Sequence, residues 1–296
     1  MHFGLSPIQS GGDFDATIAE CERAEAAGFD SVWLGEHHNS TLLYPAPLVG
    51  LAAIAARTRR VRLGTGVLLL PLYHPLAVAE EAAMVDVVSR GRLILGVGAG
   101  YAPEEFTAFG VSMKERGSRL DEAVPLIHRL WSEDAVSHAG RHYRIGSATL
   151  RPRPVQRPRP PIWFAGWVEA ALRRAGRLGD AWLGGPSAKL DELAGCVRMY
   201  REAMRTAGRD AGSSEVAPGV LSEYPELLAV RRNTLSCQLD LDRSRREFES
   251  LKPEAARSRS CDTCSSPRAS SGRAPSRVPR SSGRSRRRTS GGPTRW

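Results

Sequence analysis

Lysine is the scarcest charged residue in this chain. It occurs three times among 296 residues, at Lys114, Lys189 and Lys252, so 39 of the 42 basic residues are arginine. None of the three ends an expected strand, the place where barrels carry their catalytic side chains, so catalysis through a lysine Schiff base is disfavoured. The strong bias toward arginine is typical of a GC-rich coding sequence.

The sequence also has few cysteines and no long apolar run. Five cysteines do not make a disulfide framework for a chain of this size, and we expect a reducing, cytoplasmic setting. No apolar run is long enough to span a bilayer, and the first residues are strand-like rather than basic and then apolar. We therefore expect neither a signal peptide nor a membrane anchor.

Acidic residues are nearly absent from residues 257–296. This stretch holds 11 Arg and 11 Ser with 4 Gly, 4 Pro and one acid, so it carries the whole net charge of +10 and residues 1–256 are neutral. It has too little apolar surface to offset the entropy lost on ordering, so we expect a disordered tail. We attribute the C-x-x-C spacing of Cys261 and Cys264 within it to chance. A non-catalytic protein that binds nucleic acid through this tail is one alternative, which the neutral body and the lack of interleaved aromatics disfavour.

Short apolar strands alternate with amphipathic helices at intervals of roughly thirty residues, the pattern of parallel sheets and barrels. The expected strands are 1–5, 31–34, 61–70, 92–97, 162–165, 180–183 and 216–221. The expected helices are 14–28, 47–57, 76–89, 103–109, 116–132, one that ends at 178, and 189–207. A hairpin is expected over 136–145, and Pro125 is expected to disturb the helix around it.

We interpret this alternation as an α/β fold, a TIM barrel that is incomplete at its C-terminal end. No eighth strand is evident after Leu221, so we assign residues 1–221 to the barrel domain. A GC-rich sequence translated in the wrong frame gives strings of Arg, Ser, Pro and Gly. Our hypothesis is that the reading frame shifts between residues 215 and 230, which leaves 222–256 uncertain and out of frame.

A polar cluster ends the second expected strand, where segment Leu34–His38 reads Leu-Gly-Glu-His-His. Because successive strand residues point to opposite faces, only one of His37 and His38 faces a barrel mouth. We assign His37 to the site and His38 to packing, with a buried polar cluster of no function as the alternative. We expect no metal, because the other histidines lack the paired spacing of ligands. Glu36 is the one clear acid at a strand end in the first half of the chain, which disfavours a two-carboxylate hydrolase.

Glycine turns accompany three other expected strands. Thr65–Val67 interrupts the third strand with a residue that permits unusual backbone geometry. Gly98–Tyr101 follows the fourth strand without the G-x-G-x-x-G spacing of dinucleotide sites. We interpret it as a turn that lets the backbone approach a flat ring, with a purely structural turn as the alternative. Gly166–Val168 opens a helix whose free amides suit a phosphate, although the turn offers no Ser or Thr hydroxyl.

In order and spacing, segments 34–38, 61–67, 70–75 and 90–101 resemble the bacterial luciferase-like flavin monooxygenases. The likeness covers about residues 1–220 and implies a (β/α)8 barrel that binds reduced FMN, or in sister enzymes a deazaflavin, at the carboxyl ends of its strands. By position, His37 resembles the family's active-site histidine, and Gly66–Val67 falls where the family often has a non-proline cis peptide. The cofactor-binding residues that the resemblance implies are Thr65, Gly66, Val67, Gly98, Ala99, Gly100, Tyr101, Gly166, Trp167 and Val168.

The reaction implied by the resemblance is monooxygenation of a small organic substrate. Reduced FMN and oxygen form a flavin hydroperoxide that transfers one oxygen atom, and His37 acts as a general acid or base. No dinucleotide-binding domain is evident, so a separate flavin reductase is expected, and a homodimer is compatible with the resemblance. Deazaflavin-dependent hydride transfer on the same barrel is the alternative.

The chain departs from the family pattern at two turns. Ala99 stands where the light-emitting enzymes have a basic residue, and Trp167 and Val168 stand where Ser or Thr is usual. Both departures weaken the expected grip on a phosphate.

Overall fold

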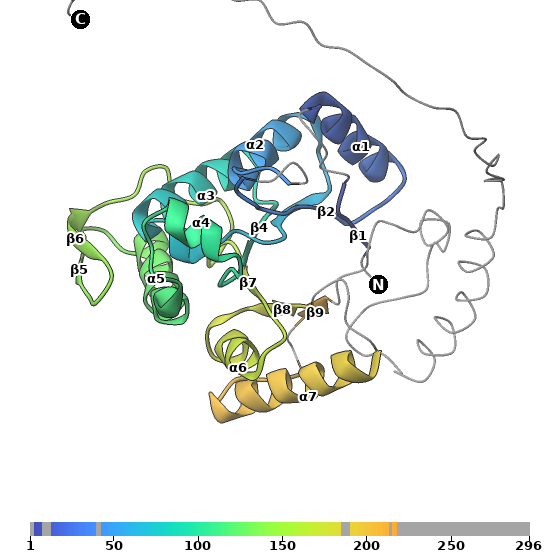
Figure 1. Cartoon of the computed structure of the whole chain (residues 1–296). Coiled ribbons are helices and arrows are strands. Elements are labelled where there is room, and N and C mark those ends of the chain that lie inside the picture. The colour runs from blue at the N-terminus through green and yellow to red at the C-terminus, as the bar shows by residue number, and fades with distance from the viewer. Residues whose placement is uncertain (1–2, 8–12, 40–42, 185–189, 213–214, 218–296) are drawn as a thin grey trace, which may run out of the picture.

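The computed structural model describes residues 3–7, 13–39, 43–184, 190–212 and 215–217. Within them, seven parallel strands form one sheet in the order of the chain, β1-β2-β3-β4-β7-β8-β9. The strands are β1 (Gly4–Leu5), β2 (Ser31–Leu34), β3 (Arg62–Thr65), β4 (Leu93–Val97), β7 (Ile162–Ala165), β8 (Ala181–Leu183) and β9 (Glu215–Ala217). The sheet is curled, and the helices lie along its outer side (Figure 1).

Helices connect the strands, as parallel neighbours require. The helices are α1 (Phe14–Ala26), α2 (Pro47–Arg57), α3 (Pro75–Ser89), α4 (Pro103–Ala108), α5 (Arg116–Ser132), α6 (Glu169–Leu178) and α7 (Leu190–Thr206), with two 3-10 turns, η1 (Leu70–Leu72) and η2 (Met113–Glu115). A separate antiparallel pair, β5 (Val136–Ala139) and β6 (Arg144–Ala148), follows α5 and forms the predicted hairpin. The predicted α/β class with seven parallel strands is thus confirmed, and within the described residues these strands form part of a barrel.

Side chains on the two faces of the strands build two packed layers. Leu34, Leu63 and Leu95 are fully buried in the main core shared with the helices. On the other face, Trp33 and Trp163 stack with ring centroids 5.2 Å apart. Burying one such leucine stabilises the fold by about 1.5–3 kcal/mol, so the continuous apolar strands account for the sheet.

Helix α5 has the predicted bounds, 116–132, and the proline that was expected to disturb it does not end it. The helix is continuous over Arg116–Ser132 with the proline inside it. An interior proline costs about 3 kcal/mol, but α5 buries Leu120, Val124, Ile127 and further apolar side chains against the core. Since each of these contributes about 1.5–3 kcal/mol, packing outweighs the local cost.

The predicted third strand, 61–70, is wrong in length. Strand β3 ends at Thr65, the Gly66–Val67 peptide is cis, and η1 follows at Leu70. Leu68, Leu69 and Leu70 are apolar because they are buried, although they are not part of a strand. The apolar run indicated burial, and it was wrongly taken to indicate an extended strand. The predicted strand residues 218–221, segment 222–256 and tail 257–296 lie outside the described residues.

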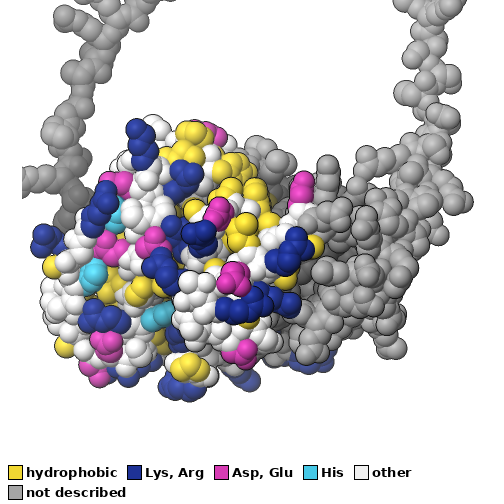
Figure 2. All heavy atoms as spheres, turned by 90° about the horizontal axis from the view of Figure 1, so that it is seen from below, with side chains coloured by type: hydrophobic (Ala, Val, Ile, Leu, Met, Phe, Trp, Pro, Cys, Tyr) yellow, Lys and Arg dark blue, Asp and Glu magenta, His cyan; other side chains and the backbone are white. Residues whose placement is uncertain are grey.

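Basic and acidic side chains are interspersed on the face of the molecule in Figure 2. This agrees with the neutral charge of residues 1–256. No helix among the described residues is long and apolar enough to cross a membrane.

Candidate active site

The loops after β2, β3 and β4 are joined by backbone hydrogen bonds at the carboxyl edge of the sheet. The N–H of Gly66 donates to the carbonyl of Leu34 at 2.7 Å, which ties the loop after β3 to the end of β2. The N–H of Leu68 donates to Gly96 at 2.8 Å, and the N–H of Gly98 donates back to Leu68 at 2.9 Å. The predicted histidine and two of the predicted glycine turns therefore lie at one edge, where parallel barrels build their sites.

His37 lies in this edge between a buried carboxylate and an exposed phenol. Its Nδ1 is 2.7 Å from Oε1 of Glu105, and its Nε2 is 2.8 Å from the hydroxyl of Tyr101. The His37 side chain is 24% exposed, whereas that of Glu105 is 1% exposed. The imidazole is therefore reachable from solvent on its Nε2 side and anchored in the protein on its Nδ1 side.

Glu105 was not predicted from the sequence as a member of this site. It lies in the first turn of α4 next to Glu104, and acidic residues are common in the first turn of any helix. Nothing local distinguishes the two, yet Glu104 is exposed and Glu105 is buried. The distinguishing contact, to a residue 68 positions away, exists only in the folded chain.

His38 is held in the wall of the site by a second buried carboxylate. Its Nε2 is 2.7 Å from Oε1 of Glu36, and its ring packs against Phe109 with centroids 4.4 Å apart. Glu36 also accepts hydrogen bonds from the Tyr73 hydroxyl and, at 2.5 Å, from the N–H of Leu69. Glu36 thus fastens the end of β2 to the segment that follows β3.

Burial governs the protonation of this second cluster. It raises the pKa of Glu36, although the hydrogen bonds from Tyr73, Leu69 and His38 act in the opposite direction. Burial and the neighbouring Glu36 raise the pKa of Tyr73, which keeps its phenol protonated and able to donate. The cluster therefore supports the wall, with its carboxylate fully buried and the His38 side chain 11% exposed.

At Gly96 and Gly98 the space that a Cβ would need is filled by atoms at the end of β3 and in the loop after it. A Cβ at Gly98 would lie 2.5 Å from Cγ2 of Val67, and one at Gly96 would lie 1.9 Å from the carbonyl oxygen of Thr65. Gly66 is exposed and Val67 is partly exposed at the same edge. Gly98 is buried, and Ala99 and Gly100 are partly exposed.

Thr65 differs from the other predicted cofactor residues. Its side chain is fully buried, and its hydroxyl donates to the carbonyl of Gly96 at 2.6 Å. The structure thus places this hydroxyl between β3 and β4, where it holds the two strand ends together, and not on the surface of the site.

The third predicted turn, Gly166–Val168, follows β7, the neighbour of β4. Trp167 and Val168 are each 60% exposed. Val168 begins α6 without a side-chain cap, and Glu169 in the first turn pairs with Arg173. The described residues of this turn carry neither a cation nor a hydroxyl, so a phosphate here would depend on the backbone amides.

A flat aromatic cofactor fits the residues of this edge better than its phosphate does. The exposed Gly66 backbone carries no side chain, and the 68% exposed Tyr101 offers an aromatic ring beside His37. For the phosphate, the edge offers the backbone amides at the N-terminus of α6, which has no side-chain cap and is a weaker binding feature. Among the described residues no group of three or more His, Cys, Asp or Glu could hold a metal ion.

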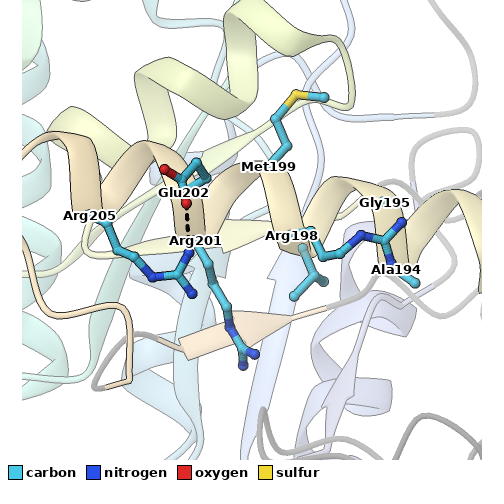
Figure 3. A pocket seen from close by; sticks show the side chains of 8 residues that line it. Ala194, Gly195, Arg198, Met199, Arg201, Glu202 and Arg205 are labelled. Atoms are coloured by element: carbon cyan, nitrogen blue, oxygen red, sulfur yellow. Dashed lines mark hydrogen bonds and ion pairs between the residues drawn. The ribbon is translucent and has the colours of Figure 1, made fainter.

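A separate hollow lies on α7 and shares no residue with this edge. It is lined by α7 residues that include Met199, Arg198 and the Arg205–Glu202 ion pair of 2.7 Å (Figure 3). It contributes no group to the chemistry around His37.

Comparison with known proteins identifies the family of the chain. Residues 2–222 match the family described as luciferase-like monooxygenase. The chain is 39% identical over 156 residues to the oxygenase component of a flavin-dependent trigonelline monooxygenase from Acinetobacter baylyi, which spans 51% of this chain and 43% of that protein. It is 38% identical over 199 residues to an F420-dependent glucose-6-phosphate dehydrogenase from Kineococcus radiotolerans, which spans 64% of this chain and 58% of that protein. The chain thus covers less than two thirds of the length of either relative.

A solved structure agrees with these relatives. The crystal structure of the monooxygenase RslO1 from Streptomyces bottropensis superposes with a TM-score of 0.66 at 36% identity, over 71% of this chain and 68% of that one. The curled sheet and its helices are therefore those of the family.

Proposed function

Because the chain belongs to the luciferase-like monooxygenase family, we propose that it is a flavin-dependent monooxygenase that acts on a small organic substrate with reduced FMN and oxygen. The observation that carries this proposal is the placement of the His37 imidazole at the edge where the loops after β2, β3 and β4 are bonded together. An acid-base group beside an open, glycine-lined surface is what a flavin enzyme needs.

Each part of the edge has a distinct task in this proposal. The exposed Gly66 backbone and the turn Gly98–Gly100 would face the flat ring, and the amides at the start of α6 would meet the phosphate. Bound reduced FMN supplies the electrons and the oxygen chemistry. His37 would exchange a proton with the substrate through Nε2, and the exposed rings of Tyr101 and Trp167 would limit the access of water.

Deazaflavin-dependent hydride transfer is a second candidate. It is favoured by the similar identity of the chain to an F420-dependent dehydrogenase, 38%, and to a flavin-dependent monooxygenase, 39%. F420 is a deazaflavin, and hydride transfer also needs a proton acceptor in the position of His37. The described geometry serves both chemistries.

Cofactor titration separates the two candidates. The purified full chain is titrated with reduced FMN and with F420 under anaerobic conditions, and oxygen consumption is then followed after air is admitted. Saturable FMN binding with oxygen uptake supports the monooxygenase. Binding of F420 alone, without oxygen uptake, supports hydride transfer, and binding of neither cofactor contradicts both.

A His37→Ala variant tests the assigned role. We expect turnover to fall by about 10²- to 10⁴-fold, the usual contribution of an acid-base group, with FMN affinity nearly unchanged. His74→Ala is the matched control, because that histidine caps the start of α3. A separate reductase would supply reduced FMN, as the "oxygenase component" relative suggests. Added flavin reductase with NADH should then sustain turnover.

A further inference from the structure

We propose that Glu105 is a positioning residue that holds His37 in the tautomer with its proton on Nδ1, so that Nε2 is the proton acceptor facing the mouth. Glu105 lies in the first turn of α4, and its side chain is 1% exposed. The tautomer concerns this chain's own side chains, and only its catalytic consequence rests on the proposed function.

The hydrogen bonds around Glu105 determine where the proton lies. Oε1 of Glu105 accepts the backbone N–H of His38 at 2.8 Å, and an amide N–H can only donate. The same oxygen lies 2.7 Å from Nδ1 of His37. As a carboxylate, Glu105 has no proton to donate, so its Oε1 accepts from both groups and Nδ1 carries the hydrogen. In a neutral imidazole the other nitrogen is then an acceptor, and the Tyr101 hydroxyl donates to Nε2 at 2.8 Å.

The burial of Glu105 adds an electrostatic effect to this geometry. The ion pair of Glu105 within the described residues is with His37, and its Oε2 is buried without a hydrogen-bond partner there. A buried carboxylate that lacks a permanent counter-charge stabilises a positive charge that arises beside it. Protonation of Nε2 creates such a charge on the ring that Glu105 contacts. Glu105 therefore lies against the ring on which such a charge would form.

The Tyr101 hydroxyl marks the place of the proton donor. Its side chain is 68% exposed, so the ring is free to rotate away from Nε2 and expose it to another group. A substrate that carries a hydroxyl or another acidic hydrogen could then donate to the same nitrogen. The geometry assigns His37 the role of a base in its resting state.

The neighbouring cluster supplies a matched control. Glu36 faces His38 instead of His37, and it also accepts hydrogen bonds from Tyr73 and Leu69. It is 3% exposed and is the second buried glutamate at this edge. Replacing Glu36 should change the ring protonation of His38 and leave that of His37 as it is.

The tautomer can be measured directly in the full chain by ¹⁵N NMR of ring-labelled histidines. Signals are assigned by comparison with His37→Gln and His38→Gln, and no cofactor is needed. We expect His37 to show a protonated Nδ1 and an unprotonated Nε2 above its titration midpoint. A protonated Nε2 in the unmodified chain would overturn the proposal without any variant of Glu105.

Two variants test the acceptor role of Glu105. Glu105→Leu removes the acceptor, and we expect the His37 proton to move to Nε2. Glu105→Gln keeps an acceptor oxygen, so the proton should stay on Nδ1. If Glu105→Leu fails to fold, Glu105→Gln still decides, because a proton on Nε2 in that variant contradicts the acceptor role.

The catalytic consequence has its own readout. In Glu105→Leu, turnover should fall on the order of 10²-fold at unchanged FMN affinity, and Glu105→Gln, which keeps the acceptor, should retain most of the turnover. Glu36→Gln should leave the tautomer of His37 in place. If the tautomer is as expected but no cofactor binds, the proposed function fails and the positioning role stands. If FMN binds and the Glu105→Leu tautomer equals that of the unmodified chain, the positioning role fails alone.

Discussion

A methyl group added at Gly98 tests whether the turn after β4 must be bare because of Val67. The new Cβ of Gly98→Ala would lie 2.5 Å from Cγ2 of Val67 but 3.6 Å from its Cβ. Rotation of Val67 about χ1 would therefore relieve the clash, and the backbone needs no change because Gly98 is not among the glycines of positive φ. Overpacking lowers the free energy of unfolding by about 1–3 kcal/mol. Because Val67 is partly exposed, we expect Gly98→Ala to cost about 1 kcal/mol.

Urea unfolding of the unmodified chain and four variants measures this cost. Gly98→Ala should lower the free energy of unfolding by about 1 kcal/mol at unchanged m-value. Val67→Ala removes the clashing methyl, so the double variant should recover most of the loss as a coupling energy of about 0.5–1 kcal/mol. Gly146→Ala is the control, because a Cβ there meets nothing within 4 Å. Strict additivity of the two substitutions would refute the reasoning, since it would mean that the methyl groups do not meet.

Three further perturbations test other features of the molecule. Pro125→Ala should raise the stability of the chain by about 1–3 kcal/mol in the same assay, because an exposed interior proline costs about 3 kcal/mol relative to alanine. Burial, with a smaller effect of the nearby Arg159, lowers the pKa of His128 from 6.5 to about 4. Because the pKa of His128 is lower in the folded state, the free energy of unfolding is highest above pH 6.5 and falls by up to about 3 kcal/mol as the pH drops toward 4. In His128→Gln, unfolding curves measured over this pH range should show a smaller decrease. Resequencing of the coding DNA over codons 215–230 should reveal a frame shift near residue 222, where the family match ends, and an intact frame would remove that hypothesis.

Predictions from the sequence succeeded where one physical signal dominated. Strands 31–34 and 162–165 and helices 47–57 and 116–132 have the predicted bounds, because burial periodicity, Pro47 at a helix start and polar strand ends agree with one another. The strand prediction for the segment after β3 was wrong because its apolar residues are buried without being extended. Apolar periodicity indicates burial, but it does not indicate whether the backbone N–H groups of a segment are hydrogen-bonded to a neighbouring strand.

The placement of the two histidines illustrates the same limit. The alternation of strand side chains predicted different surroundings for His37 and His38. Both residues follow β2, which ends at Leu34, and each ring meets its own carboxylate. Which carboxylates these are could not be predicted, since Glu36 is adjacent whereas Glu105 comes from a helix two strands further along the chain.

Local sequence, then, determined the alternation of strands and helices, the neutral charge of residues 1–256 and the presence of an imidazole at a strand end. Apolar periodicity and turn residues fix these properties within a few neighbouring positions. The tertiary structure alone decided that Glu105, rather than Glu104, lies against His37, that Tyr101 meets Nε2, and that Glu36 fastens the loop after β3. These contacts join residues 33 to 68 positions apart, and they depend on the register of parallel strands, which brings distant loops to one edge.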